Sequence, residues 1–444
     1  MSAAPERSSP SPRWLGGARL AACLLRGSAP GPIDRDGLIA ADIEIVDGRI
    51  AAIAPVGHAP ADAGTRDLAG GLVLPAFVDV HTHLDKGHIW PRAPNPDGAF
   101  QSARAAVRAD RQAHWRAADM SRRIEFALMC AHAHGTRAIR THLDSFPDHA
   151  EISWRVFGEL RDAWAGRVEL QAVSLMTLDV VMGEWGERLA DIVAESGGVL
   201  GGVPLIEEGA GVDLDAAIER LLDRAEARGL DLDLHVDEDA APETAVLGRL
   251  ARAVARRGFK GRVLCGHCCS LALQAPEDAR ATIAACAEAG IAIVSLPMCN
   301  MYLQDRAPGR TPRWRGVTPL REIAAGGVTA MVASDNCRDP FFAYGDHDMV
   351  EVLREAVRIC HLDHPLGDWP RAVTATPAEI MGLGDAGVIA RGAPADLVLF
   401  RARNWNELLA RPQSDRVVLR GGSALDARPP DYRMLDDLMG GAQP

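Results

Sequence analysis

Short apolar runs alternate with longer amphipathic stretches through the middle of this 444-residue chain. Stretches such as 214–228 and 240–257 carry apolar residues at the spacing of one helix face, so they predict α-helices. The apolar runs between them are nearly continuous, which is typical of parallel strands that are buried on both faces. Eight such runs occur, at 71–80, 137–141, 168–174, 199–203, 230–234, 262–265, 291–296 and 328–333. This alternation predicts an α/β protein with a (β/α)8 TIM-like barrel, whose active site lies at the carboxyl ends of the strands.

Both ends of the chain show a different pattern, in which polar and apolar residues alternate over short stretches. The stretch 43–53 (IEIVDGRIAAI) has Asp-Gly at its centre, which predicts a β-hairpin with a two-residue turn. Similar stretches return at 396–400 and 416–419. We therefore expect a tail and one part of a small β-sandwich from residues 1–70, and the remainder with a C-terminal tail from 385–444. The (β/α)8 barrel then spans residues 71–384.

Composition and charge narrow the class of protein. The net charge of −12, with no cluster of basic residues, argues against a nucleic-acid partner. No apolar run approaches the roughly 20 residues that cross a bilayer, and the apolar patches near residues 14–25 lack a cleavage site. The nine cysteines are unevenly spread, which favours reduced thiols. These features predict a cytoplasmic protein with neither a membrane nor a nucleic-acid partner.

Histidine or aspartate stands at the end of four predicted strands. His81 and His83 end the first, His235 the fifth, His267 the sixth and Asp335 the eighth. Residues two apart in an extended chain point the same way, so the first two histidines can reach one ion. Strand ends of a barrel meet at one rim, so all five side chains are expected there. Such ligands describe a catalytic site for Zn²⁺ or Fe²⁺, with Mn²⁺ as a further candidate.

These residues lie in motifs through which the chain resembles the amidohydrolase superfamily. The motifs are HTHLDK (81–86), RTHLD (140–144), HVDE (235–238), GH (266–267), the spaced polar residues of NMYLQDR (300–306) and SDNCRDP (334–340). Within the superfamily, the chain is similar to the cytosine deaminase group, which includes N-isopropylammelide amidohydrolase. The resemblance implies a hydrolase of carbon–nitrogen bonds in cyclic amidines.

The implied reaction is hydrolytic deamination of a cytosine-like aminopyrimidine or related amino-heterocycle, such as cytosine, 5-methylcytosine or isoguanine. Metal-bound hydroxide attacks the ring and ammonia leaves. Two alternatives remain, a cyclic amidase that opens a ring and an amidohydrolase of N-substituted amino-triazines. An inactive scaffold protein is disfavoured because the proton-transfer carboxylates are retained. Relatives are commonly oligomers, so we expect a homo-oligomer that acts on a small heterocyclic molecule.

The resemblance also implies a role for each residue of the site. Asp335 accepts the proton of the attacking water, Glu238 moves a proton to the ring nitrogen, and His267 orients the hydroxide and stabilises the oxyanion. These are the general acid–base and electrostatic roles that suit a carboxylate and an imidazole. The implied metal ligands are His81, His83, His235 and Asp335.

The number of metal ions can be argued from the lysines. Many relatives with two metals bridge them through a carboxylated lysine at the end of strand four. The two lysines of this chain, Lys86 and Lys260, lie near strands one and six instead. One metal ion per subunit is therefore favoured, with Glu207 or Glu208 as the alternative bridging carboxylate.

The sequence departs from the cytosine deaminase group at positions that contact the ring. Thr177 stands where the group has a glutamine, Asn336 replaces an aspartate, and Phe341 holds an aromatic position. The metal chemistry is expected to survive these changes, whereas the identity of the ring is left open. Trp90, in the loop 87–100, can either stack on a planar ring or pack within the loop. His142 and Asp144 can orient a ligand or substrate, or form a satisfied polar pair at a strand end.

Overall fold

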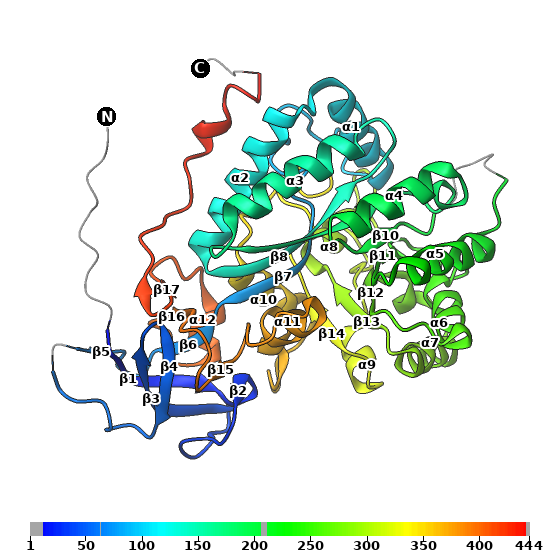
Figure 1. Cartoon of the computed structure of the whole chain (residues 1–444). Helices are drawn as coiled ribbons and strands as arrows, with labels where there is room; N and C mark the ends of the chain where they lie inside the picture. Colours follow the sequence, from blue (N-terminus) through cyan, green and yellow to red (C-terminus); the bar gives the residue numbers. More distant parts are fainter. Residues whose placement is uncertain (1–11, 63, 206–210, 441–444) are drawn as a thin grey trace.

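The computed structural model describes residues 12–62, 64–205 and 211–440, and its fold is α/β (Figure 1). Each of the eight predicted apolar runs overlaps a strand. These strands are β7 (Phe77–Thr82), β8 (Thr136–Asp144), β9 (Glu169–Leu175), β10 (Leu200–Gly202), β11 (Leu232–Val236), β12 (Val263–His267), β13 (Ala292–Ser295) and β14 (Ala330–Val332).

The eight strands follow one another side by side in chain order. The pairs β7–β8, β8–β9 and each successive pair from β10 to β14 are parallel. Two isolated parallel bridges complete the order. Val173 pairs with Val199 beside β10, and Thr82 at the end of β7 pairs with Asp335 beyond β14. The arrangement is TIM-barrel-like, and the carboxyl ends of the strands share one rim.

Helices follow the strands and cover their outer side (Figure 1). None of the described helices is long and apolar enough to span a lipid bilayer. They are α1 (Phe100–His114), α2 (Ala117–His134), α3 (Ala150–Trp164), α4 (Glu184–Glu195), α5 (Leu214–Arg228), α6 (Val246–Arg257), α7 (Pro276–Ala289), α8 (Pro297–Leu303), α9 (Leu320–Ala325), α10 (Met349–Cys360), α11 (Ala375–Met381) and α12 (Trp405–Ala410).

One predicted helix begins later than its pattern indicates. The stretch 240–257 is helical only from Val246 onward. The carboxylate of Asp237, just beyond β11, accepts hydrogen bonds from the amides of Val246 at 3.0 Å and Leu247 at 3.1 Å. A carboxylate on the first amides of a helix defines its start, and here it comes from outside the helix. The predicted bounds of α5 are confirmed.

Strands from both ends of the chain form a second sheet beside the eight parallel strands (Figure 1). The predicted hairpin is confirmed, since its turn residues Asp47 and Gly48 have φ of 51° and 75°. A two-stranded sheet of β2 (Leu25–Arg26) and β15 (Ile389–Ala390) lies apart from the larger one. The order of the larger sheet is β18 (Ser423–Ala424), β17 (Val417–Arg420), β16 (Leu397–Leu399), β6 (Leu72–Pro75), β1 (Trp14–Ala21), β3 (Leu38–Val46) and β4 (Arg49–Ala54), with β5 (Thr65–Asp67) on β1.

The apolar run 71–80, which predicted one strand, is divided between the two sheets. β6 pairs with β1 and β16, whereas β7 pairs with β8. The amide of Ala76 donates to the carbonyl of Asp396, and the next amide, of Phe77, donates to the carbonyl of Gly135. Consecutive amides of a strand point to opposite sides, so the chain passes directly from one sheet to the other.

The C-terminal residues 431–440 run along α2 (Figure 1). Arg122 on α2 forms an ion pair with Asp437 at 2.5 Å. Leu435 is buried against Phe126 and Cys130 of the same helix. The last described residues of the chain therefore pack against α2, near the segment that follows β7.

Candidate active site

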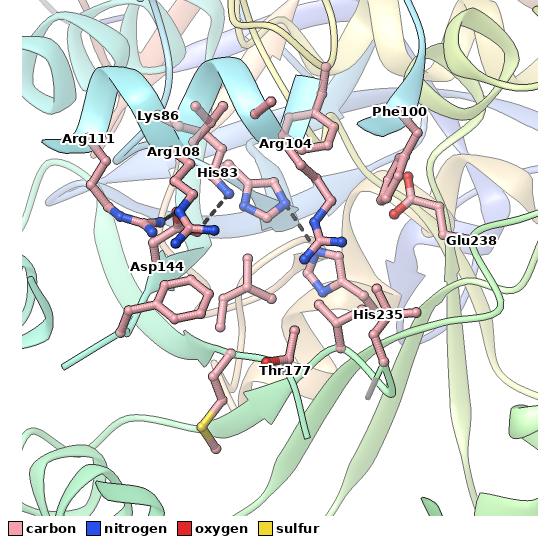
Figure 2. Close-up of a pocket in the computed structure, with 18 of the residues that line it drawn as sticks. His83, Lys86, Phe100, Arg104, Arg108, Arg111, Asp144, Thr177, His235 and Glu238 are labelled. Carbon is pink, nitrogen blue, oxygen red and sulfur yellow. Dashed lines mark hydrogen bonds and ion pairs between the residues drawn. The ribbon is translucent and has the colours of Figure 1, made fainter. Parts of the chain in front are cut away.

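A cavity of about 730 Å³ opens at the carboxyl ends of the strands (Figure 2). Most of the side chains predicted from the sequence line it. His81 is fully buried behind the cavity wall, and Trp90 is not among the described residues that line the cavity. The predicted residues at its surface are His83, His235, Glu238, His267, Asp335, Thr177, Asn336 and Phe341.

The chain holds Asp335 against the first strand. Its amide donates to the carbonyl of His81 at 2.9 Å, and its carbonyl accepts from the hydroxyl of Thr82 at 2.7 Å. Asp335 has a φ of 63°, and His267, at the end of β12, has 70°. Backbone conformations that are uncommon for residues other than glycine cost free energy and cluster at functional sites. The strain here is compensated by bonds that bring strand ends one and eight together.

The four predicted metal ligands lie within reach of one another. Asp335 Oδ1 is 3.6 Å from His81 Nε2 and 3.3 Å from His83 Nε2. His235 Nε2 is 3.1 Å from His83 Nε2, and the rings of His81 and His235 are 4.6 Å apart. The geometry therefore gathers at one point the side chains that the sequence supplies from strands one, five and eight.

The hydrogen-bonding state of these histidines fits a metal ion. Among the described residues, neither nitrogen of His81 has a hydrogen-bond partner, and Nδ1 of His83 and of His235 also lack one. Burial and neighbouring positive groups hold the pKa of all three well below the usual value, so the rings are neutral. Neutral imidazole nitrogens and a carboxylate are the ligands of catalytic Zn²⁺, Fe²⁺ and Mn²⁺ sites. The donor set present is compatible with one such ion.

His267 is oriented by a neighbour outside the strands. The side-chain amide of Asn300 on α8 donates to His267 Nδ1 at 2.9 Å and to Glu238 Oε1 at 3.3 Å. Because Nδ1 accepts a hydrogen bond, the ring proton is assigned to Nε2. That nitrogen has no partner among the described residues. His267 therefore offers an N–H donor in the cluster, as an oxyanion-stabilising group requires.

Glu238 and Asp335 form a pair of buried carboxyl groups. Burial, together with the negative charge of Asp335, raises the pKa of Glu238 well above its usual value. Burial raises the pKa of Asp335 to about 7. Two carboxylates that share a buried site do not ionise together readily, so one of them holds a proton near neutral pH. A proton donor and a proton acceptor are thus present at the same wall of the cavity.

The structure adds His142 to the cluster, although its role is open in the sequence. Its ring lies 4.0 Å from that of His81, and ligand atoms of His142, His81 and His235 lie within 4.8 Å of one another. Neither nitrogen of His142 has a hydrogen-bond partner among the described residues. The alternation of Arg140, His142 and Asp144 along β8 is the sequence signal for this shared face.

Asp144 is a satisfied ionic group, which was one of the two interpretations of the sequence. Its carboxylate accepts from Lys86 Nζ at 2.8 Å and from Arg111 Nη1 at 2.7 Å, and all three side chains line the cavity. Lys86 is therefore engaged in an ion pair. Glu207 and Glu208, the alternative bridging carboxylates, lie outside the described residues.

Three arginines that the sequence analysis did not single out reach the cavity from α1. Arg104, Arg108 and Arg111 extend from the helix toward Thr177 on the opposite wall (Figure 2). They are spaced four and three residues apart and so share one helix face. This spacing was the available signal, and it marks a positively charged wall in a chain of negative net charge.

The chain matches the amidohydrolase family profile over residues 64–150 and 127–423. A pterin deaminase from Rhizobium rhizogenes is 57% identical over 406 residues, which are 91% of this chain and 92% of that protein.

Two solved structures have the same architecture. The 5-methylcytosine deaminase from Klebsiella pneumoniae, with phosphonocytosine bound, is 25% identical with a TM-score of 0.78, covering 94% of this chain and 98% of that one. An N-isopropylammelide isopropylaminohydrolase from Burkholderia multivorans is 26% identical with a TM-score of 0.73, covering 93% and 97%.

Replacing Asp144 by asparagine is expected to destabilise the protein. The change leaves Lys86 and Arg111 buried without their carboxylate, which costs about 3–5 kcal/mol in the free energy of unfolding. Chemical denaturation measures the loss, with Asp148→Asn, an exposed position in the loop that follows β8, as the matched control. Equal stability of the two variants would contradict the assigned pairing.

The same ion pairs predict a dependence of stability on pH. Burial acts to raise the pKa of Asp144, but Lys86 and Arg111 outweigh it and hold the pKa below its usual value. A lowered folded-state pKa contributes stability above the unfolded value of about 3.9, and this is lost as the pH falls through the folded value. The difference in the free energy of unfolding between the wild type and Asp144→Asn should therefore become smaller as the pH is lowered, which chemical denaturation at a series of pH values measures.

Proposed function

Because this chain belongs to the amidohydrolase family and hydrolyses carbon–nitrogen bonds in cyclic amidines, we propose that it is a metal-dependent pterin deaminase. The observation that carries the choice of ring is the high identity to the pterin deaminase over nearly the whole length of both chains. Hydrolytic deamination of an amino-heterocycle is also the reaction to which the cytosine-type relative points. The product of pterin would be the corresponding dioxopteridine and ammonia.

The size of the cavity supports a fused two-ring substrate. Pterin contains an aminopyrimidine with the N=C–NH2 unit of the cytosine-like rings that the sequence predicts, although its amino-bearing carbon lies between two ring nitrogens, and it carries a second ring. Small-molecule pockets commonly measure about 300–1,000 Å³. The cavity of about 730 Å³ leaves room for the second ring. A cytosine-like substrate stays a prediction, and the two rings can be compared directly.

We assign the metal to His81, His83, His235 and Asp335, with one ion per subunit. A divalent ion held there supplies a Lewis acid and a water molecule of lowered pKa. The unpartnered ring nitrogens of the histidines support this assignment. Zn²⁺, Fe²⁺ and Mn²⁺ all suit these donors, so the identity of the ion is a matter for measurement.

The residues of the chain then divide the proton transfers. Asp335 accepts a proton from the attacking water, and Glu238, whose pKa burial and Asp335 raise well above its usual value, donates to the ring nitrogen next to the attacked carbon. His267 donates its Nε2–H to the oxygen on which negative charge develops. On collapse the oxygen passes its remaining proton to Glu238 and becomes a carbonyl, and the amino group takes the proton held by Asp335 and leaves as ammonia. Each step uses a group whose protonation state agrees with its surroundings.

We further assign the ring contacts to Thr177, Asn336 and Phe341, all of which line the cavity. The side-chain amide of Asn336 donates to Asp339 at 2.6 Å, and its carbonyl oxygen, which accepts from Cys299 Sγ at 3.5 Å, has a second lone pair for an N–H of the ring. The ring of Phe341 lies edge-to-face with Phe100 at 5.6 Å and offers an apolar surface to a planar substrate. Trp90 is not assigned a contact, because it is absent from the described lining of the cavity.

The architecture that fits this site is a closed (β/α)8 barrel over residues 71–384 and a β-sandwich from 1–70 and 385–444. The bridge between Thr82 and Asp335 supports closure, because it joins the first strand to the chain after the last. The joint sheet of β1, β6 and β16 supports the sharing of the smaller unit by both chain ends. Homo-oligomerisation stays a prediction.

Glu238→Gln is expected to retain the metal and to lose about 10²- to 10⁴-fold in kcat, because it removes a proton donor and no metal ligand. Steady-state kinetics with metal analysis by mass spectrometry tests this. Glu243→Gln, an exposed position on the same loop, is the matched control and should keep wild-type activity. Full activity of Glu238→Gln would contradict the assignment of Glu238 as the proton donor.

A substrate panel tests the ring. Ammonia release is measured from pterin, cytosine, 5-methylcytosine, isoguanine, creatinine and an aminotriazine, and the product is identified by mass spectrometry. We expect the highest kcat/KM for pterin, with one ammonia released per substrate molecule and the ring system intact. A ring-opened product would refute deamination, whereas ammonia from a single-ring substrate alone would refute pterin as the substrate.

The arginine wall predicts a preference within pterins. A carboxylate substituent on the second ring can pair with Arg108, so Arg108→Ala should raise KM about five- to tenfold for a carboxylated pterin and leave kcat nearly unchanged. Unsubstituted pterin should not respond. Arg155→Ala, exposed on α3 outside the cavity, serves as the control. An equal rise in KM for both substrates would argue against this pairing.

A further inference from the structure

A second group of metal-ligating side chains lies outside the candidate active site. His88 follows β7, and Cys337 and His347 lie on the segment between β14 and α10. One ligand atom from each lies within 4.8 Å of the others. The three side chains are 2%, 2% and 3% exposed. The proposed deamination uses none of them.

The two histidines are unsatisfied where they are buried. Among the described residues, no ring nitrogen of His88 or His347 has a hydrogen-bond partner. The rings are 5.7 Å apart between centroids, and they do not satisfy one another. A neutral imidazole has one donor and one acceptor, and leaving a buried polar group unpaired costs about 1–3 kcal/mol. Burial lowers the pKa of His347 to about 4, so its ring is neutral and its lone pair is available.

We propose that His88, Cys337 and His347 bind a structural zinc ion. Two imidazoles and a thiolate are typical zinc ligands, with bonds of about 2.0–2.3 Å, so binding requires side-chain movements below about 1 Å. An ion at this position satisfies a nitrogen of each histidine. It also explains why a thiol and two unpaired imidazoles are buried together, which otherwise costs stability.

The surroundings balance the charge of the ion. The backbone of His347 hydrogen-bonds to the sulfur of Cys337, and Asp346 is close enough to His88, Cys337 and His347 to influence the pKa of each. A thiolate at Cys337 and the carboxylate of Asp346, which also lies 2.8 Å from His134 Nε2, would bring two negative charges near the divalent cation. Cys130 on α2 hydrogen-bonds to Asp346 and adjoins the cluster as a further thiol.

The site is closed from outside by the C-terminal segment. The ring of Phe126 stands edge-to-face on His88 at 4.8 Å, and Leu435 packs on Phe126. The hydroxyl of Tyr432 donates to Asp346 at 3.2 Å. A covered site without room for substrate is typical of structural rather than catalytic zinc.

The position of the ion indicates what it stabilises. His88 lies five residues beyond His83, and Cys337 lies two residues beyond Asp335. The amide of His88 already donates to the carbonyl of Cys337 at 3.1 Å. A zinc ion would therefore clamp together the two segments that carry the proposed catalytic ligands.

The test measures metal content and the spectrum of the cobalt-substituted full-length protein. Tetrahedral Co²⁺ bound to a thiolate has an intense near-ultraviolet charge-transfer band, which the proposed catalytic ligands cannot produce because none of them is a cysteine. We expect this band in the wild type. Cys337→Ala should lose the band and one equivalent of metal, whereas Cys360→Ala, a second cysteine away from the cluster, should keep both.

His83→Ala separates this proposal from the proposed function. It should lose the catalytic metal and activity and still keep the thiolate band. His347→Ala provides a second variant with the opposite pattern, in case Cys337→Ala does not fold. Absence of the band in the cobalt-loaded wild type, or an unchanged band and metal content in folded Cys337→Ala, would overturn the zinc site while leaving the deaminase proposal intact.

Discussion

Neutral imidazoles packed against one another beneath the strand ends constrain the rest of this structure. Each ring needs a hydrogen-bond donor, an acceptor or a metal. Yet β7, β8 and β11 bring His81, His142 and His235 together where several ring nitrogens have no partner in the described part of the chain. Burial keeps the rings uncharged, which prevents repulsion between them and leaves their lone pairs exposed to one point. Two cations beside this cluster are paired with carboxylates, Lys86 with Asp144 and Arg140 with Asp233.

Carboxyl groups at the rim are divided into two environments. Asp144 faces two cations and stays ionised, whereas Glu238 faces Asp335 in a buried wall and tends to keep its proton. Residues of one chemical type thus acquire different protonation states from their neighbours alone. Asn300 also fixes the orientation of two of these groups, since its side-chain amide donates to both His267 and Glu238.

The sequence could predict that these side chains meet at one rim, because strand ends in a parallel α/β fold share one edge and the histidines and Asp335 stand at those ends. The sequence could not indicate features that depend on contacts between residues far apart in the chain. The start of α6 is set by Asp237 outside the helix, and the division of the run 71–80 depends on Asp396 and Gly135. The arginines of α1 were overlooked because helix periodicity alone does not tell whether a polar face meets solvent or a cavity.

The division of the run 71–80 also bears on how the protein is made. β6 is sandwiched between β1, synthesised before it, and β16, which follows more than 320 residues later by the numbering of the two strands. During translation β7, the first of the eight parallel strands, therefore emerges directly after β6, while the sheet that contains β6 still lacks β16 and the strands beyond it. Until β16 leaves the ribosome, one edge of β6 has unpaired backbone groups. That edge must be covered in the meantime, or it can pair with another nascent chain.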